Sequence, residues 1–147
     1  MSRYLVVAHS TVTNPRLLEQ LRTMTKDDPQ AEFVLLVPAT AVRHLPFRSR
    51  EQEPELAARK LASRARAMFT KKGINLVDAR VGAESPIAAI DEEVQAHPDY
   101  AGFVISTLPQ ETSRWLRLDL PQAVRSRYRQ PVHHVQAPPD WTAGDLP

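Results

Sequence analysis

The chain has 147 residues, 42% of them hydrophobic, and no cysteine, and its 19 Lys and Arg exceed its 17 Asp and Glu by only two. Without cysteine it has no disulfide scaffold, thiolate zinc site, iron–sulfur cluster or cysteine nucleophile. Because 15 of the 19 cations are arginine, the isoelectric point is 9.2 without a large net charge, and the total does not indicate a nucleic-acid-binding protein.

The first half of the chain predicts two strands and two helices. Residues 4–8 form a short apolar run typical of a buried strand, and Asn14 reads as the cap of a helix with proline at its first position. Residues 32–37 predict a second buried strand. Residues 53–72 carry the longest helical pattern of the chain.

The second half predicts three more strands and two helices. Residues 75–81 alternate apolar and polar side chains, which suits a strand with one partly wet face. Ser85 caps a third helix, and residues 102–105 predict a buried strand. Asp119, with a glutamine three residues later, reads as a capping box that opens a fourth helix. Residues 131–135 predict the last strand.

This alternation predicts one α/β domain with an open, parallel five-stranded sheet and helices on both faces. We expect the domain to span residues 1–136. Residues 137–147 contain three prolines and no periodicity, which predicts a mobile C-terminal tail. No apolar run reaches the roughly 18 residues of a membrane helix. The apolar stretch at residues 4–8 is too short for a secretory signal, so we expect a cytoplasmic protein that does not contact membranes.

In a sheet of this kind, ligands bind beyond the carboxyl ends of the strands. The segment after the fourth strand carries several hydroxyl groups and two arginines, whose planar guanidinium groups match phosphate or carboxylate. The residues predicted to bind a ligand are His9, Ser10, Ser106, Thr107, Ser113, Arg114 and Arg117. In the alternative interpretation, Trp115 docks this segment on the core and both arginines are solvated.

No catalytic, metal or cofactor site is predicted. The five histidines lack the spacing of a zinc motif, and neighbouring His133 and His134 point to opposite faces of a strand. No serine lies in a nucleophile elbow, and four glycines are too few for a glycine-rich phosphate loop. Asp91, Glu92 and Glu93 fan around one helix and are expected to be solvated. We therefore expect a binding protein rather than an enzyme.

The order of elements, the long second helix, the Gly82 loop and the closing strand that begins at Pro131 resemble the universal stress protein family. The resemblance covers about residues 3–136 and implies the sheet order 3-2-1-4-5. More specifically, the sequence STLPQETSRWLRLDLP from Ser106, followed by PVHHV, is similar to a subgroup of small proteins of this fold.

The nucleotide-binding branch of that family carries the motif G-x2-G-x9-G-[ST] after its fourth strand. Here Ser106 and Pro109 stand where the first two glycines belong, and Leu118 and Asp119 stand where the last Gly-[Ser/Thr] pair belongs. Proline removes a hydrogen-bond donor, and Asp119 places a negative charge where a phosphate would lie. The chain therefore resembles the branch that lacks the ATP motif.

The resemblance implies a binding or regulatory protein that does not bind ATP and needs no cofactor. Its loop from Ser106 to Arg117 is expected to bind a small anion or a partner group, or only to stabilise a dimer. Two alternatives stay open: nucleotide binding through a non-standard phosphate loop, and a hydrolase or transferase on the same fold. The last strand lies at a sheet edge and lacks the Lys, acidic residue or interior Pro that blocks an edge, which predicts a homodimer through that strand. Residues 138–141 could instead cover the edge.

Overall fold

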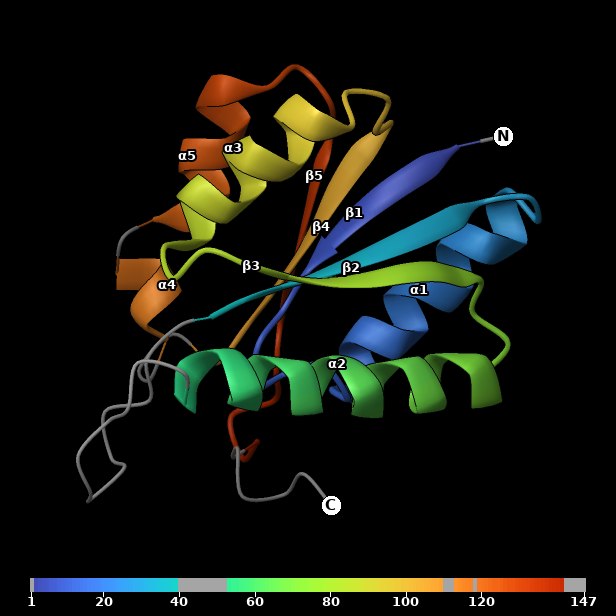
Figure 1. Ribbon diagram of the computed structural model, residues 1–147. Coiled ribbons are helices and arrows are strands. Elements are labelled where there is room, and N and C mark those ends of the chain that lie inside the picture. Colours follow the sequence, from blue (N-terminus) through green and yellow to red (C-terminus); the bar gives the residue numbers. More distant parts are fainter. Residues whose placement is uncertain (1, 40–52, 110–112, 118, 142–147) are drawn as a thin grey trace.

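The computed structural model describes residues 2–39, 53–109, 113–117 and 119–141. These residues form one five-stranded parallel sheet in the order β3-β2-β1-β4-β5, which confirms the predicted fold and strand order (Figure 1). The elements are β1 (Arg3–Val7), α1 (Pro15–Asp27), β2 (Glu32–Pro38), α2 (Glu53–Lys71), β3 (Leu76–Gly82), α3 (Pro86–Ala96), β4 (Gly102–Thr107), α4 (Arg114–Arg117), α5 (Leu120–Arg127) and β5 (Val132–Gln136).

Helices cover both faces of the sheet. In Figure 1, α1 and α2 lie on one face, and α3, α4 and α5 lie on the other. The central strand β1 supplies both cores, because its side chains alternate: Val6 joins the cluster under α1 and α2, while Leu5 and Val7 join the cluster under α3 and α5. All three side chains are fully buried. Such a strand is apolar on both faces, as residues 4–8 are in the sequence.

The predicted caps of α1 and α3 are confirmed. Asn14 Oδ1 accepts a hydrogen bond from the backbone N–H of Arg16 at 3.0 Å. Ser85 Oγ accepts one from the backbone N–H of Ala88 at 3.4 Å. Each cap is followed by a proline, whose missing N–H would have had no partner within the helix in any case.

Gly82 at the end of β3 sets how closely α3 packs on the sheet. A Cβ at this position would lie 2.7 Å from Cβ of Ala89 and 2.9 Å from Cδ1 of Leu36. Both distances are below any real carbon–carbon contact, so the close approach of α3 to β2 and β3 requires a residue without a side chain.

Asp119 is the N-cap residue of α5, as predicted, but the predicted capping box is not formed. Asp119 adopts a left-handed conformation, with φ of 52° and ψ of 50°, and its side chain makes no capping hydrogen bond. The reason is the short helix α4, which the sequence did not predict. The N–H of Asp119 donates to the carbonyl of Leu116 at 3.0 Å, so Asp119 closes α4 and turns the chain directly into α5. Aspartate tolerates this conformation better than most residues.

The prediction that Asp91, Glu92 and Glu93 form a solvated face of their helix is wrong for Glu93. Its side chain is only 7% exposed, accepts a hydrogen bond from the hydroxyl of Tyr100 at 2.7 Å and forms an ion pair with Arg80. Asp91 accepts hydrogen bonds from Arg127 and Tyr128 on the α5 side. The three carboxylates do fan around the helix, and for that reason two of them reach neighbouring elements.

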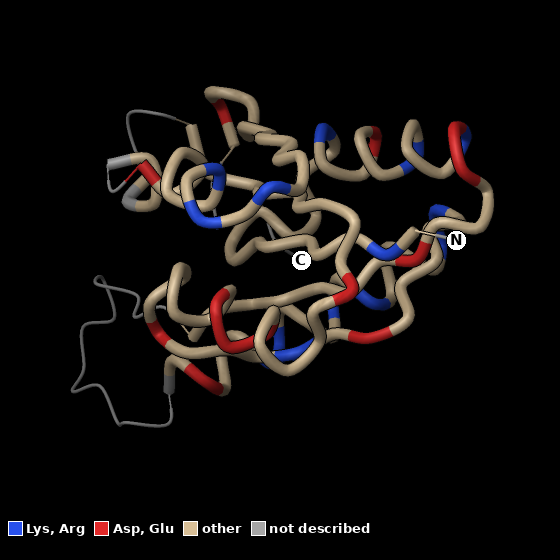
Figure 2. The backbone as a smooth tube through the Cα atoms, turned by 90° about the horizontal axis from the view of Figure 1, so that it is seen from above, with Lys and Arg blue, Asp and Glu red and all other residues tan. Residues whose placement is uncertain are grey.

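The described charges are interspersed along the backbone in Figure 2, and many pair locally. Asp78 on β3 lies within 4 Å of both Arg66 and Arg80, and Arg3 bridges Glu32 and Asp99. Of these pairs, those of Arg3 join segments distant in sequence, whereas Asp78 and Arg80 lie on the same strand. Because the groups are largely exposed, each pair adds little stability on its own.

Candidate functional site

The carboxyl ends of all five strands lie along one edge of the sheet, toward the left and lower left of Figure 1. The strand order reverses between β1 and β4, because the chain builds β2 and β3 on one side of β1 and then returns to add β4 and β5 on the other. Open α/β sheets bind ligands at such a switch point. The loop after β1 and the end of β4 are therefore the first place to look.

A hydroxyl pair joins these two segments. Oγ1 of Thr11, in the loop after β1, lies 2.7 Å from Oγ of Ser106 near the end of β4, and both residues are 1% exposed. The structure thus brings the predicted site residue Ser106 to the switch point and gives its hydroxyl a partner within the chain. Thr11, which the sequence analysis did not single out, holds the β1–α1 loop against β4.

Thr107, which follows Ser106 on β4, projects to the opposite face of the sheet and has a different hydrogen-bond partner. Oγ1 of Thr107 lies 2.9 Å from Nε2 of His134 on β5, and Thr107 is 2% exposed. Burial lowers the pKa of His134, and the nearby guanidinium of Arg125 lowers it further. His134 was not predicted as a site residue, since two adjacent strand histidines carry no sign of which one meets a polar partner.

Ser113 starts the short helix that follows β4. Its Oγ accepts a hydrogen bond from the backbone N–H of Leu116 at 3.1 Å, and the side chain is 2% exposed. Arg114 and Arg117 are the first and last residues of α4, and their side chains lie outside the described structure. Trp115 between them is 8% exposed and packs in the cluster under α3 and α5. Trp115 therefore docks this helix on the core, whereas the solvation of the two arginines stays a prediction.

His9 is a predicted site residue with a side-chain nitrogen that has no hydrogen-bond partner among the described residues. It lies two residues after β1, and its Nε2 is buried without a hydrogen-bond partner among the described residues. Burial lowers the pKa of its imidazole, which favours the neutral form. Ser10 beside it is half-buried.

A second side-chain nitrogen without a hydrogen-bond partner, Nδ2 of Asn14, follows in the same loop. Asn14 is fully buried, and although its Oδ1 caps α1, its Nδ2 has no partner among the described residues. The sequence indicated only the cap. A buried polar atom without a partner destabilises a fold by about 1–3 kcal/mol, so each of these two atoms calls for a polar partner such as an ordered water or a ligand.

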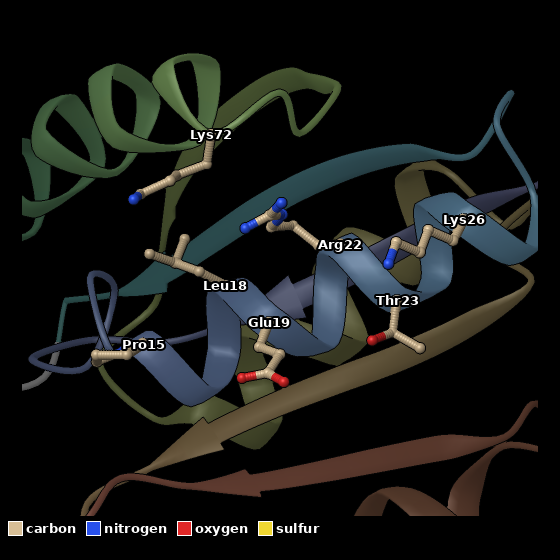
Figure 3. Close-up of a pocket in the computed structure, with 7 residues that line it drawn as sticks. All are labelled: Pro15, Leu18, Glu19, Arg22, Thr23, Lys26 and Lys72. Atoms are coloured by element: carbon tan, nitrogen blue, oxygen red, sulfur yellow. The ribbon is translucent and has the colours of Figure 1, made fainter.

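Two surface hollows lie along α1, and neither is lined by a predicted site residue. One, of about 460 Å³, lies between α1 and the residue after α2, where Arg22 and Lys72 approach from opposite sides above Leu18 (Figure 3). The other, of about 420 Å³, lies between α1 and β5 and is lined by Arg16, Glu19, Gln20, Thr23, His134, Val135 and Gln136. Neither was predicted, since both arise from tertiary packing of exposed polar side chains.

Metal-binding clusters and membrane-spanning helices are both absent from the part of the chain that the structure describes. No group of three or more His, Asp or Glu side chains in residues 2–39, 53–109, 113–117 and 119–141 is arranged to hold a metal ion. Within the same ranges, no helix has the length and apolar character needed to cross a bilayer.

The comparisons find known proteins that are similar to this chain in structure but none that match it in sequence. No family model matches the sequence, and no curated protein matches it. Several solved structures do match. A universal stress protein family protein from Arabidopsis thaliana with AMP bound superposes with a TM-score of 0.65 at 14% identity, over 95% of this chain and 94% of that one.

Two further structures agree. A universal stress protein in complex with cAMP superposes with a TM-score of 0.61 at 15% identity, over 93% of this chain and 98% of that one. A universal stress protein from Archaeoglobus fulgidus gives 0.60 at 15% identity, over 92% and 93%. The strand order, the placement of the helices and the near-complete overlap in both directions lead to one conclusion: this chain has the universal stress protein fold.

Proposed function

We propose that this protein is a binding or regulatory module of the universal stress protein type, without enzymatic activity, that takes a small anion at the loop after β1. The unpartnered, buried Nε2 of His9 is the observation that carries the proposal. Nδ2 of Asn14 in the same loop supports it, since an amide N–H is a natural donor to an anion. Ser10 and the arginines of α4 complete the predicted set.

The hydroxyls of Ser106, Thr107 and Ser113 have a supporting role in this proposal. Each is bonded within the chain, so each fixes the loops around the ligand rather than donating to it. The neutral His9 gains a proton when an anion binds, because a nearby negative charge favours imidazolium. We therefore expect anion affinity to rise as the pH falls from 8 toward 6.

The test is a thermal-shift and calorimetry panel of phosphate, sulfate and acetate on three proteins: wild type, His9→Ala and His97→Ala. His97 is the matched control, since it caps the far end of α3 and lies away from the loop after β1. A ligand at 100 times its dissociation constant stabilises by about 2.7 kcal/mol. We expect the shift in wild type and His97→Ala and its loss in His9→Ala. Equal shifts in all three would overturn the proposal.

The alternative ligand class is a nucleotide. The structures with AMP and cAMP bound share this fold, so both nucleotides belong in the panel. For ATP we propose a dissociation constant no tighter than about 1 mM, which is about 4 kcal/mol of affinity. The reason is the sequence after β4, where Pro109 lacks an N–H and Asp119 is an acid; Leu118 lies outside the described residues. Calorimetry that shows micromolar ATP binding would contradict this.

We also propose that the protein is a homodimer that pairs its β5 edges antiparallel. In the ladder with β4, the carbonyl of Pro131 accepts from Phe103 and the N–H of Ala137 donates to Thr107, so the backbone groups of odd-numbered residues face β4. Those of residues 132, 134 and 136 face outward. Arg125 and Arg16 donate to the outward carbonyls of Val132 and Gln136, and the outward N–H groups still need a partner or a cover.

The tail does not supply that cover in its described part. The N–H of Ala137 extends the ladder to β4, and the N–H of Trp141 donates to the carbonyl of Pro138 within the tail itself. Light scattering of wild type at tens of micromolar is expected to give twice the chain mass of 16.6 kDa. His134→Pro removes the outward N–H at the middle of the edge, together with the imidazole that bonds to Thr107, and is expected to give a folded monomer. A wild-type mass of one chain would rule the dimer out.

A further inference from the structure

We propose that the hollow between α1 and the end of α2 is a second ligand site, which binds a phosphate monoester through Arg22 and Lys72. Its volume of about 460 Å³ lies within the range of about 300–1,000 Å³ that is typical of small-molecule sites. The hollow lies along α1, whereas the anion site proposed above lies in the loop before that helix. The inference is therefore independent of the proposed function and goes beyond it.

Positive charge dominates this hollow. Arg22 and Lys26 line it from α1, and Lys72 lines it from the residue after α2. Glu19 is the one carboxylate among the described residues around it. Figure 3 shows the side chains of Arg22 and Lys72 on the side of α1 that faces α2, whereas the carboxylate of Glu19 points toward β5. Glu19 also lines the hollow on the β5 side, so this acid does not neutralise the two cations.

Neither of the two cations has a partner in the part of the chain that the structure describes. No ion pair or hydrogen bond there involves the side chain of Arg22 or Lys72. Arg22 also stands four residues before Lys26 on the same helix, a spacing at which like charges destabilise a helix. By contrast, several other arginines lie within 4 Å of a carboxylate, namely Arg3, Arg59, Arg66, Arg80 and Arg127. Unpaired cations that face one hollow favour an anion with more than one charge.

Both cations project from rigid parts of the backbone. Arg22 lies in the middle of α1, one turn after Leu18, which packs in the cluster under α1 and α2. At the end of α2, the N–H of Lys72 donates to the carbonyl of Met68 at 3.0 Å. Gly73 follows with φ of 76°, the left-handed conformation in which helices commonly end. Because the backbone on both sides is fixed, a ligand needs to order only the two side chains.

These two side chains match a phosphoryl group better than a carboxylate. The planar guanidinium of Arg22 can bind two oxygens at once, which uses both oxygens of a carboxylate. A phosphate monoester keeps a third oxygen for the ammonium of Lys72, and it carries a charge of about −1.5 to −2 at pH 7. It can therefore neutralise both cations, whereas a carboxylate neutralises only one.

An apolar floor lies below the gap between the two cations. Leu18 forms it in Figure 3, and Pro15 lines the same hollow one turn earlier on α1. Inorganic phosphate has no apolar part that could contact these side chains. We therefore expect the ligand to carry an apolar or aromatic group on its phosphate, which removes the surface of Leu18 and Pro15 from water.

The experiment is an NMR titration of the wild-type protein with phenyl phosphate, followed through the backbone amides. Phenyl sulfate has the same shape and one charge less, and inorganic phosphate has the charge without the ring. We expect phenyl phosphate to shift the amides of Arg22, Thr23 and Gly73 and to bind about fivefold more tightly than phenyl sulfate. We also expect it to bind more tightly than inorganic phosphate. Shifts confined to His9 and Ser10 would overturn this site and leave the proposed function intact, and the absence of any shift would overturn it as well.

Substitutions then test the two cations. Arg22→Gln and Lys72→Gln each remove one exposed cation and are expected to raise the dissociation constant of phenyl phosphate by about 5- to 10-fold. Arg64→Gln is the matched control, since Arg64 is exposed on α2, has no partner among the described residues and does not line the hollow. It is expected to leave the dissociation constant unchanged. Equal effects of all three substitutions would show attraction to overall charge only, and an effect of only one of Arg22→Gln and Lys72→Gln would overturn the arrangement of two cations around one phosphate.

Discussion

Glu93 shows how one buried acid can join three parts of the fold. Its carboxylate receives Arg80 from β3 and the hydroxyl of Tyr100 from the segment before β4. Burial, followed by the hydrogen bond to Glu93, raises the pKa of Tyr100 well above its ordinary value, so the hydroxyl stays protonated and remains a donor. Arg80 in turn contacts Asp78.

We predict that Glu93→Ala lowers the free energy of unfolding by about 3 kcal/mol, because it leaves the guanidinium of Arg80 and the hydroxyl of Tyr100 without their buried partner. Urea denaturation measures the change. Glu92→Ala is the matched control, since Glu92 is exposed one residue earlier on the same helix, and it should change stability by less than about 0.5 kcal/mol. Equal effects of the two substitutions would show that the network contributes nothing.

At the scale of single residues, the sequence identified caps and strand positions better than polar contacts. Asn14 and Ser85 were predicted as caps because a helix start has a local signature. The hydrogen bonds from Thr11 to Ser106 and from Thr107 to His134 join residues far apart in the chain, so no local sequence pattern predicts them. Of the predicted site residues, the structure gathers His9, Ser10 and Ser106 at the switch point, and whether they bind a ligand stays a prediction.

At the scale of elements, the two confirmed caps differ in their surroundings. Asn14 is fully buried and its hydrogen bond is 3.0 Å long, whereas Ser85 is exposed and its bond is 3.4 Å long. We predict that Asn14→Ala destabilises the fold by about 1–2 kcal/mol and that Ser85→Ala does so by about 0.5 kcal/mol. Thermal unfolding of the two variants tests the order, and a larger loss in Ser85→Ala would contradict it.

The strands and the four longer helices could be predicted from the sequence because their apolar spacing is regular over many residues. The helix α4 could not, since four residues carry too short a pattern and Trp115 reads equally well as a docked loop. Because α4 precedes it, Asp119 begins α5 in a left-handed conformation and without the predicted side-chain hydrogen bond, although it keeps the N-cap position. Errors of this kind concentrate where two short elements share a boundary.

At the scale of the whole molecule, the buried His9 makes stability depend on pH. Burial lowers the pKa of His9 below the ordinary histidine value of 6.5, so the unfolded chain binds a proton there that the folded chain resists. Stability is therefore complete above pH 6.5 and falls as the pH drops toward the folded pKa. The slope for one such group is at most about 1.4 kcal/mol per pH unit.

We predict that His9→Gln has a shallower loss of stability between pH 7 and 5 than wild type, while His97→Gln keeps the wild-type profile. Urea titrations at one fixed, low protein concentration measure it, so that dimerisation contributes equally throughout. If His9→Gln and wild type lose stability in parallel, the acid sensitivity belongs to another group.

The position of β1 in the middle of the sheet also governs the order in which the chain can fold. Leu5 pairs with Val34, 29 residues later, and with Phe103, 98 residues later. Closing the shorter loop is entropically easier, and the cluster under α1 and α2 draws almost entirely on residues before position 75.

During synthesis, one side of the sheet can therefore be complete while β1 still has a free edge and Leu5, Val7 and Leu36 lack the helices that later bury them. We expect pulse-labelled hydrogen exchange during refolding to show amides of β1 and β2 protected before those of β4 and β5. Until β4 arrives, the buried residues Leu5, Val6 and Val7 belong to a strand that still has an unpaired backbone edge, which makes the nascent first half the stage most in need of a chaperone.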